Sequence, residues 1–325
     1  MSEKELLSKK VFIFILAASL LVGIVGLMLI TAGMNTAFGD YFYNDDIAFA
    51  IFSVISYIGD DLVYIIVGAS AFYIYDKRFA KNMMFALLGS SYLNSILKDI
   101  FQDPRPSTNI RNGNPVETGN GFPSGHAQGS TTTYGYMAFH VQTNYAEEKW
   151  YSYIPWILVV LIYLISISRQ IIGVHDVEDI VGGILIGITF LLIYIHLEPI
   201  VSERINTMVF VNKLSFAIAI PVAMFIIALA VFPTSQSDYG MVCGAFTGLA
   251  AGYVLENEKI QYDPTTLDNK QRIINLAIGL AITLVLYIVL SLIDVDIAIW
   301  RYFKYLIISL VAIILVPWIF TKIQK

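Results

Sequence analysis

The sequence predicts an all-α protein, folded as a polytopic bundle of membrane helices. Three observations support this: 57% of the 325 residues are hydrophobic, only 14% are charged, and the mean hydropathy is +0.69. Soluble domains are about 45–50% apolar and about 25% charged, so the composition excludes an ordinary soluble domain. It also excludes a disordered chain, and the net charge of −5 excludes a nucleic-acid-binding protein.

Ten segments are apolar enough to be predicted as membrane helices, because about 20 residues of helix cross a hydrocarbon core about 30 Å thick. They are residues 11–33, 62–75, 82–97, 126–141, 153–167, 177–195, 214–232, 240–255, 273–293 and 305–320. The third and fourth are weakly apolar, and we expect neighbouring helices to shield them from lipid. We therefore predict a six-helix core at residues 1–200 and about four additional C-terminal transmembrane helices at residues 201–325.

The basic residues predict the orientation of these helices. With both chain ends in the cytoplasm, all but six of the 20 Lys and Arg residues lie on the inner side. The outer segment 34–61 contains no Lys or Arg but five Asp residues. This is the positive-inside distribution. The six outer basic residues are Lys98, Arg105, Arg111, Arg169, Arg301 and Lys304. Since an ordinary outer loop is poor in basic residues, Lys98, Arg105 and Arg169 need a specific reason to be there.

One more apolar segment, residues 45–58, is too short for a complete span. It begins with acidic residues that favour a helix start, and it contains the aromatic side chains Phe49, Phe52 and Tyr57. We expect a helix lying in the outer membrane interface, where aromatic side chains are enriched. A short half-span is the alternative.

The first of three polar segments follows the third predicted span. Lys98 stands at the end of that helix, and Arg105 stands between Pro104 and Pro106. Because a residue before proline is driven out of the helical region, the helix must end before Arg105. Two cations are thus expected together, just beyond the membrane core.

The second polar segment opens the fourth predicted span with Phe122, Pro123, Ser124, Gly125 and His126. Pro and Ser are typical of a helix start, and glycine lets the backbone approach a ligand closely. The free N–H groups of a helix N-terminus attract an anion. We expect Ser124 and Gly125 to bind an anion, with His126 beside it in the first turn.

The third polar segment connects the fifth and sixth predicted spans and contains Arg169, His175 and Asp179. His175 and Asp179 are four residues apart, so they share one helix face. A carboxylate that accepts a hydrogen bond from one ring nitrogen leaves the other nitrogen with a free lone pair, as in a catalytic triad. Arg169 adds a third cation.

Three cations and an anion-binding turn indicate a site for phosphate. Phosphoryl transfer depends on positioning and on stabilising charge at the phosphate oxygens, and these cations supply both. One histidine can attack phosphorus while the other protonates the leaving oxygen. Composition alone does not decide which one attacks, but the Asp four residues after His175 favours His175. The sequence has one cysteine, Cys243, and no cluster of His and acidic residues that predicts a metal.

At these positions the chain resembles the type 2 phosphatidic acid phosphatase superfamily, which includes lipid phosphate, polyprenyl diphosphate and sphingosine-1-phosphate phosphatases. The resemblance covers the first six predicted spans, and the additional C-terminal helices look like the sphingosine-1-phosphate phosphatase branch. The signature residues are Lys98, Arg105, Pro106, Pro123, Ser124, Gly125, His126, Ser168, Arg169, His175 and Asp179.

The resemblance implies a role for each of these groups. Lys98, Arg105 and Arg169 would bind the phosphate oxygens, together with Ser124 and the backbone N–H of Gly125. His175 would be the nucleophile, forming a phosphohistidine, with Asp179 as its orienting partner. His126 would protonate the leaving oxygen and then activate water. The resemblance implies no metal and no other cofactor.

We therefore expect an integral membrane phosphatase with an extracytoplasmic site, acting on a phosphorylated lipid such as phosphatidate, a sphingoid-base phosphate or a polyprenyl diphosphate. The lipid would enter sideways between helices, beside the segment 45–58. One alternative is a lipid-binding or lipid-translocating protein that uses the anion site without hydrolysis. Another is a phosphatase of a soluble phosphosugar.

The eighth predicted span carries glycines four residues apart, at Gly240, Gly244, Gly248 and Gly252. Glycines at this spacing form a flat stripe that another helix can approach closely. The stripe fits either packing within the subunit or a homodimer interface.

Overall fold

The computed structural model describes residues 9–145, 150–293, 295 and 297–323. Its helices are α1 (Lys9–Thr31), α2 (Ala37–Phe42), α3 (Asp46–Tyr57), α4 (Asp61–Ile74), α5 (Lys77–Phe101), α6 (Gly125–Asn144), α7 (Ile154–Ile171), α8 (Val177–Asn206), α9 (Phe210–Val231), α10 (Tyr239–Lys259), α11 (Asn269–Ser291), α12 (Ala298–Leu310) and α13 (Val316–Ile323). The strands β1 (Ile110–Arg111) and β2 (Asn114–Pro115) form a two-stranded hairpin. The predicted all-α membrane fold is confirmed. The chain ends at residues 1–8 and 324–325, predicted to be cytoplasmic, lie outside the described residues.

Each of the ten predicted segments is helical, but composition and length alone support seven membrane spans among the described residues. They are Val11–Thr31, Asp46–Ile74, Tyr151–Ile171, Val177–Asn206, Phe210–Val231, Asn269–Ser291 and Ala298–Ile323. Helices α5, α6 and α10 are not among them. For α5 and α6 this agrees with the predicted weak hydrophobicity.

Two compact units make up the chain, Met1–Asp60 with Ile96–Ile200 and Asp61–Ser95 with Val201–Lys325, here called unit 1 and unit 2. The chain passes from unit 1 to unit 2 for the second time between Ile200 and Val201, and the predicted six-helix core at residues 1–200 stays a prediction. However, α4 and most of α5, which we predicted to belong to the N-terminal core, group with the C-terminal helices. The reason is a shared core, in which Phe72 and Leu88 are buried in one cluster with Val242, Val316 and Phe320.

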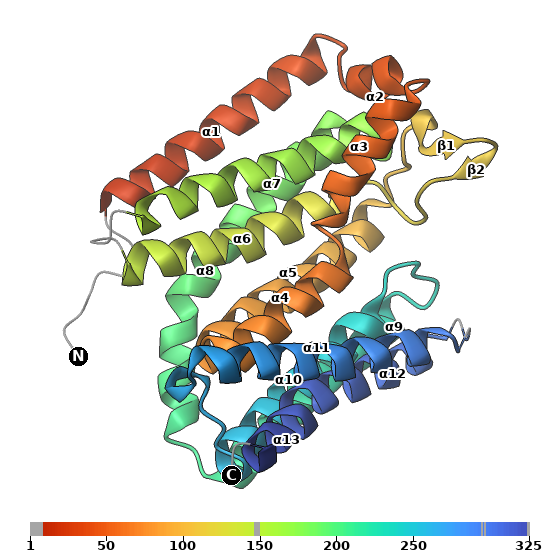
Figure 1. Ribbon diagram of the computed structural model, residues 1–325. Helices are drawn as coiled ribbons and strands as arrows, with labels where there is room; N and C mark the ends of the chain where they lie inside the picture. Colours follow the sequence, from red (N-terminus) through yellow and green to blue (C-terminus); the bar gives the residue numbers. More distant parts are fainter. Residues whose placement is uncertain (1–8, 146–149, 294, 296, 324–325) are drawn as a thin grey trace. The chain divides into compact units, whose positions relative to one another are not determined.

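In unit 1, helices α1, α6 and α7 run side by side, and the β-hairpin lies near α2 and α3 (Figure 1). The start of α6 packs closely on α8 because α8 has glycines at the contact. A Cβ on Gly183 would lie 2.7 Å from the Ser124 carbonyl oxygen, and one on Gly187 would lie 2.9 Å from that of Gln128. This backbone contact fixes the N-terminus of α6 against the first turns of α8.

Helix α3 forms as predicted. The Asp45 side chain caps it by accepting hydrogen bonds from the backbone N–H groups of Ile47 and Ala48, at 3.0 and 2.9 Å. Ile47, Val54 and Tyr57 are highly exposed. The helix then breaks at residues 58–60, so α3 and α4 are separate helices even though together they are long enough for one span.

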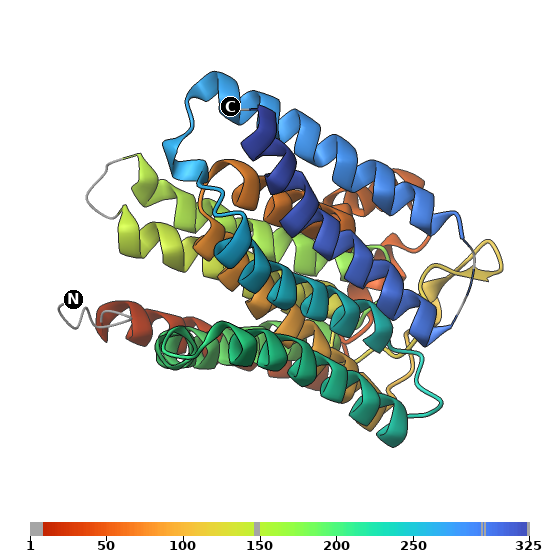
Figure 2. The same cartoon turned by 90° about the horizontal axis from the view of Figure 1, so that it is seen from below.

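In unit 2, the glycine stripe of α10 packs against α12, and Figure 2 shows these two helices side by side. A Cβ on Gly240, Gly244 or Gly248 would lie 2.2, 2.1 or 2.6 Å from a carbonyl oxygen of α12. A side chain there would overlap with the α12 backbone, so the glycines are required for this contact. The stripe is therefore used within the chain, and the dimer interface that we predicted as its alternative is not available on this face.

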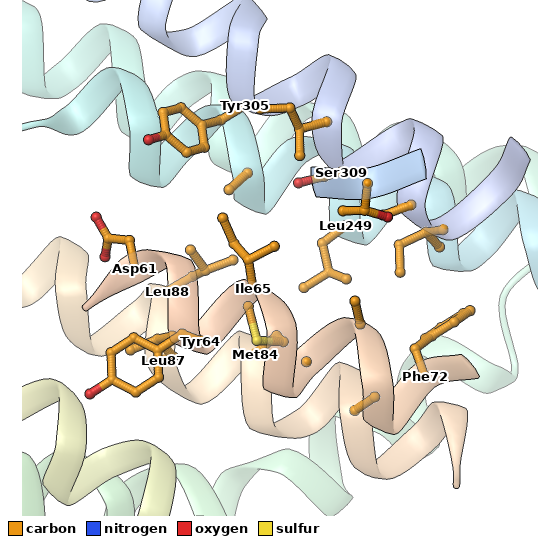
Figure 3. Close-up of a pocket in the computed structure, with 18 of the residues that line it drawn as sticks. Asp61, Tyr64, Ile65, Phe72, Met84, Leu87, Leu88, Leu249, Tyr305 and Ser309 are labelled. Atoms are coloured by element: carbon orange, nitrogen blue, oxygen red, sulfur yellow. The ribbon is translucent and has the colours of Figure 1, made fainter. Parts of the chain in front are cut away.

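Unit 2 also contains an apolar cavity lined by α4, α5, α10 and α12 and by the π-helical turn at Val311–Leu315 (Figure 3). It encloses about 860 Å³ including its open mouth. Asp61 and Tyr305 lie toward one end of the cavity, and Phe72 lies toward the other. Apart from a few polar side chains such as Ser309, its wall is hydrocarbon.

Candidate functional site

Lys98 is held by the loop that precedes α6. It lies in the last turn of α5, and its Nζ donates to the carbonyl oxygens of Asn120 and, at 3.2 Å, Gly121. Asn120 in return donates from Nδ2 to the Lys98 carbonyl oxygen at 3.0 Å. These reciprocal bonds fix the lysine beside the loop that carries Ser124, and its nearest charged groups include Arg105 and Asp179.

Arg105 connects the same loop to the turn that contains His175. Its Nε donates to the Gly119 carbonyl oxygen at 3.0 Å, and its Nη1 donates to the Val174 carbonyl oxygen at 2.9 Å. Nη1 also lies 3.3 Å from Nε2 of His175. Burial lowers the pKa of Arg105, but Glu117 nearby opposes this effect. Arg105 therefore lies outside the helix, as predicted, and the structure shows that it faces His175.

Ser124 is the N-cap of α6 and is completely buried. Its Oγ accepts from the Ala127 N–H at 3.4 Å, and its own N–H donates to the main-chain oxygen of Asp179 at 3.0 Å. Gly125 is the first residue of the helix, so its N–H belongs to the first turn, where backbone donors have no partner within the helix. The predicted anion-binding turn is thus attached directly to the Asp179 backbone.

His126 pairs with a carboxylate that our sequence analysis did not connect with the site. Its Nε2 lies 2.9 Å from Oδ1 of Asp60, in the break between α3 and α4. Gly59 allows this approach, since a Cβ there would lie 2.9 Å from Cδ2 of His126. With Nε2 engaged, Nδ1 is the remaining ring nitrogen for a substrate.

Arg169 is buried, with 3% of its surface exposed. Its Nη1 donates to Ser56 Oγ at 2.6 Å, and its Nη2 donates to Oε1 of Glu117. Its Nε is a buried donor without a hydrogen-bond partner. Because an unpaired buried donor is costly, a guanidinium held in this way is suited to an incoming anion.

His175 and Asp179 are paired, with His175 Nδ1 and Asp179 Oδ2 2.9 Å apart. The predicted shared helix face is wrong, because α8 begins at Val177 and His175 lies in the turn before it. Both residues are at most 3% exposed. Burial lowers the pKa of His175 well below its usual value, and Arg105, Arg169 and Lys98 lower it further. The imidazole is therefore neutral at physiological pH. Nδ1 donates to the carboxylate, and the lone pair on Nε2 faces Arg105.

Glu117 is the residue that our sequence analysis missed. Its Oε2 accepts from Nη2 of Arg105 at 3.1 Å while its Oε1 accepts from Arg169. Burial raises its pKa, but the charges of Arg169, His126 and Arg105 outweigh this and lower it to about 2. Only its place between the first and second polar segments hinted at this role.

The structure thus brings the predicted residues into one cluster. Arg105 contacts His175, Arg105 and Arg169 share Glu117, and Ser124 is bonded to Asp179. Such a cluster can bind a tetrahedral anion next to a neutral imidazole. Within the described residues, no three His, Cys, Asp or Glu side chains are grouped as a metal site.

Comparison with known families matches both parts of the chain. Residues 79–202 match the PAP2 superfamily model, and residues 240–325 match the model for the transmembrane extension of PAP2 superfamily phosphatases. The chain contains a PAP2 superfamily domain followed by a PAP2 transmembrane extension. The second match accounts for the helices from α10 to the C-terminus as a known extension of this superfamily.

Individual PAP2 relatives are similar over part of their length. The chain is 26% identical to lipid phosphate phosphatase delta of Arabidopsis thaliana over 54% of this chain and 45% of the relative. It is 23% identical to sphingosine-1-phosphate phosphatase 1 of Rattus norvegicus over 64% and 49%. It is 29% identical to phosphatidylglycerophosphatase B of Bacillus subtilis over 38% and 60%. The chain spans less than two thirds of each of these relatives.

Proposed function

We propose that this protein is an integral membrane lipid phosphatase that transfers a terminal phosphate to His175 and then to water. The single observation that carries the proposal is the geometry of His175, with Nδ1 2.9 Å from Asp179 Oδ2 and Nε2 3.3 Å from Arg105 Nη1. It presents a nucleophilic lone pair at the point where the cations converge.

In the first step, Nε2 of His175 attacks phosphorus and the bond from phosphorus to the lipid oxygen breaks. His126 delivers a proton to that oxygen, so the alcohol leaves in neutral form. Burial and the charge of Arg169 lower the pKa of His126, so the ring gives up its proton readily. The contact with Asp60 opposes this lowering and favours the protonated ring that the step requires. Asp179 stabilises the positive charge that develops on the His175 ring as the bond to phosphorus forms.

In the second step, water attacks the phosphohistidine, and His126 accepts the proton of that water. The bond from phosphorus to Nε2 breaks, inorganic phosphate leaves, and His175 is again neutral. Throughout, the phosphate oxygens are proposed to be bound by Lys98, Arg105 and Arg169, with Ser124 and the N–H of Gly125 at the helix N-terminus. In this proposal the stabilising positive charge comes from these side chains rather than from a metal.

A lipid substrate is supported by the relatives, whose names specify lipid phosphates, sphingosine 1-phosphate and phosphatidylglycerophosphate. It is also supported by α3, whose exposed Ile47, Val54 and Tyr57 are suited to lipid contact. We propose that α3 lies in the membrane interface and forms part of the rim through which the lipid enters.

The decisive test compares His175→Ala with His196→Ala, a histidine on α8 outside the cluster, in purified full-length protein. Phosphate release is measured with phosphatidate, a sphingoid-base phosphate and a polyprenyl diphosphate. We expect a loss of about 10³-fold or more for His175→Ala and a change below about twofold for His196→Ala, with equal melting temperatures. Turnover of the His175 variant at the wild-type rate would refute the mechanism.

We propose that the site is extracytoplasmic and that both chain ends are cytoplasmic, because the outer side is otherwise poor in Lys and Arg. The single native Cys243 is buried, so a cysteine introduced by Asn112→Cys in the exposed hairpin is a clean reporter. In intact cells we expect a membrane-impermeant maleimide to label this variant. Labelling only after permeabilisation would reverse the proposed orientation.

A further inference from the structure

Glu117 holds two of the three cations that are proposed to bind phosphate. One carboxylate oxygen accepts from Arg105 and the other from Arg169, so the group bridges the two guanidinium groups. A tetrahedral phosphate oxyanion would use the same donors, since arginine binds carboxylates and phosphates through the same N–H groups. Glu117 therefore stands where the substrate's charge is needed.

The backbone of Glu117 is fixed, so this position is a built feature of the loop. The buried side chain of Asn109 donates from Nδ2 to the Glu117 carbonyl oxygen at 2.9 Å and accepts from the Glu117 N–H at 3.1 Å. The Val116 N–H adds a bond to the Asn109 carbonyl oxygen at 2.8 Å. By contrast, the Glu117 side chain is 31% exposed, which leaves it room to swing away from the arginines.

The charge of Glu117 is present under all working conditions. The neighbouring cations hold its pKa at about 2, so the carboxylate is ionised at any pH at which the protein would act. It offers one negative charge, the same as a phosphate diester. A phosphate monoester carries close to two negative charges at neutral pH and above.

We propose that Glu117 is a built-in competitor for the phosphate site, which an incoming phosphate group must displace from Arg105 and Arg169 before it binds. Every anion then binds more weakly by one common factor, the fraction of molecules in which the arginines are free. A dianionic monoester keeps enough affinity to occupy the site. The monoanionic diester headgroups that surround the site in a bilayer do not keep enough affinity to occupy it. Glu117 therefore prevents ordinary phospholipids from binding there.

This inference rests on the proposed function, but its test does not need turnover. Binding of methyl phosphate and dimethyl phosphate to the purified full-length protein is measured at pH 8, for wild type and Glu117→Gln. We expect the substitution to strengthen the binding of both probes by the same factor, about tenfold or more. Glu117→Asp, which keeps the charge but shortens the reach, should give a smaller increase.

The matched control is Glu178→Gln in the first turn of α8, which removes the same charge and should change binding of either probe by less than about twofold. Weaker binding of both probes in Glu117→Gln would overturn the proposal, because Glu117 would then be positioning the arginines. Unchanged binding would overturn it as well. If the binding result holds but no variant releases phosphate, the proposed function fails and the competitor role stands.

The consequence for turnover can be measured on the same proteins. In detergent micelles that contain a phosphatidate substrate, added phosphatidylglycerol should leave the wild-type rate unchanged and should inhibit Glu117→Gln. Equal inhibition of the two proteins would contradict the role of Glu117 in excluding diesters.

Discussion

Two buried charged clusters, one in each unit, differ in how completely their polar atoms are bonded. In unit 2, Glu256 is completely buried, and its Oε2 lies 2.7 Å from Nζ of Lys77. Its Oε1 accepts from the Tyr262 N–H at 2.8 Å, and Asn275 donates to the Tyr262 hydroxyl at 2.8 Å. In the described part of the chain, no buried side-chain atom of Glu256, Tyr262 or Asn275 is left without a hydrogen-bond partner.

The cluster in unit 1 contains charged atoms that are buried and unbonded. Nε of Arg169 and Oδ1 of Asp179 have no hydrogen-bond partner in the structure, and the two residues are 3% and 1% exposed. Leaving such groups unsatisfied destabilises the fold, so they need another explanation. The comparison teaches that the charged cluster of unit 2 is bonded as a connection between helices, whereas the cluster of unit 1 leaves buried charged atoms unbonded, which suits it to a ligand.

The largest effect is expected on the rate of phosphate release, which depends on the cluster in unit 1. Asp179→Asn should reduce kcat for phosphate release by about 10³-fold, because it removes the charge that stabilises the His175 ring during transfer. The melting temperature should stay within a few degrees of wild type. Glu178→Gln on the same turn is the control and should keep nearly full activity. A kcat for Asp179→Asn within about tenfold of wild type would contradict the orienting role.

The next effect is on stability and belongs to unit 2. Glu256→Gln should lower the free energy of unfolding by about 3 kcal/mol, because it leaves the Lys77 ammonium without its charge partner. The exposed Glu258, two residues along α10, gives the control Glu258→Gln, which should melt like wild type. Thermal unfolding in one detergent measures both. We expect the folded Glu256 variant to keep the wild-type kcat, and a selective loss of kcat would instead make this cluster part of a site.

The smallest effect is on the pH dependence of stability, and it arises from His175 in the cluster of unit 1. The pKa of His175 is lowered in the folded protein, so below about pH 6.5 the unfolded chain binds a proton that the folded protein does not. The contribution of His175 to stability is therefore lost as the pH falls, by up to about 1.4 kcal/mol per pH unit. Asp179 opposes this loss over the same range, because burial raises its pKa to about 7 and the folded protein takes up a proton there. Between pH 7.5 and 5.5, His175→Asn should lose less melting temperature than wild type. Parallel curves would show that His175 is not held neutral.

The local parts of the site could be predicted because short-range geometry determines them. His175 and Asp179 are only four residues apart, just before α8 and in its first turn. Two prolines keep Arg105 out of α5, and Ser124 caps α6 as its type favours. The pairing of Asp60 with His126 was not predicted, because 66 residues separate them and only the break between α3 and α4 brings the carboxylate to the ring.

The glycine stripe of α10 is a second feature whose contact partner the sequence did not determine. Its spacing predicted a close helix contact, and the contact is present. The sequence contained no signal that chose between α12 and a second copy of the chain, since either partner fits a flat surface of glycines. The grouping of α4 and α5 with the C-terminal helices was likewise decided by the shared core around Phe72 and Phe320.

By itself, the sequence determined that the chain is an all-α membrane protein and that three cations and two histidines gather near the ends of its helices. Hydrophobicity and helical periodicity encode these properties within a few residues of chain. Only the tertiary structure decided that Glu117 bridges Arg105 and Arg169, the second of which is 52 residues away. Which carboxylate meets which cation depends on how distant segments close on one another, and a pattern of neighbouring residues carries no information about that closure.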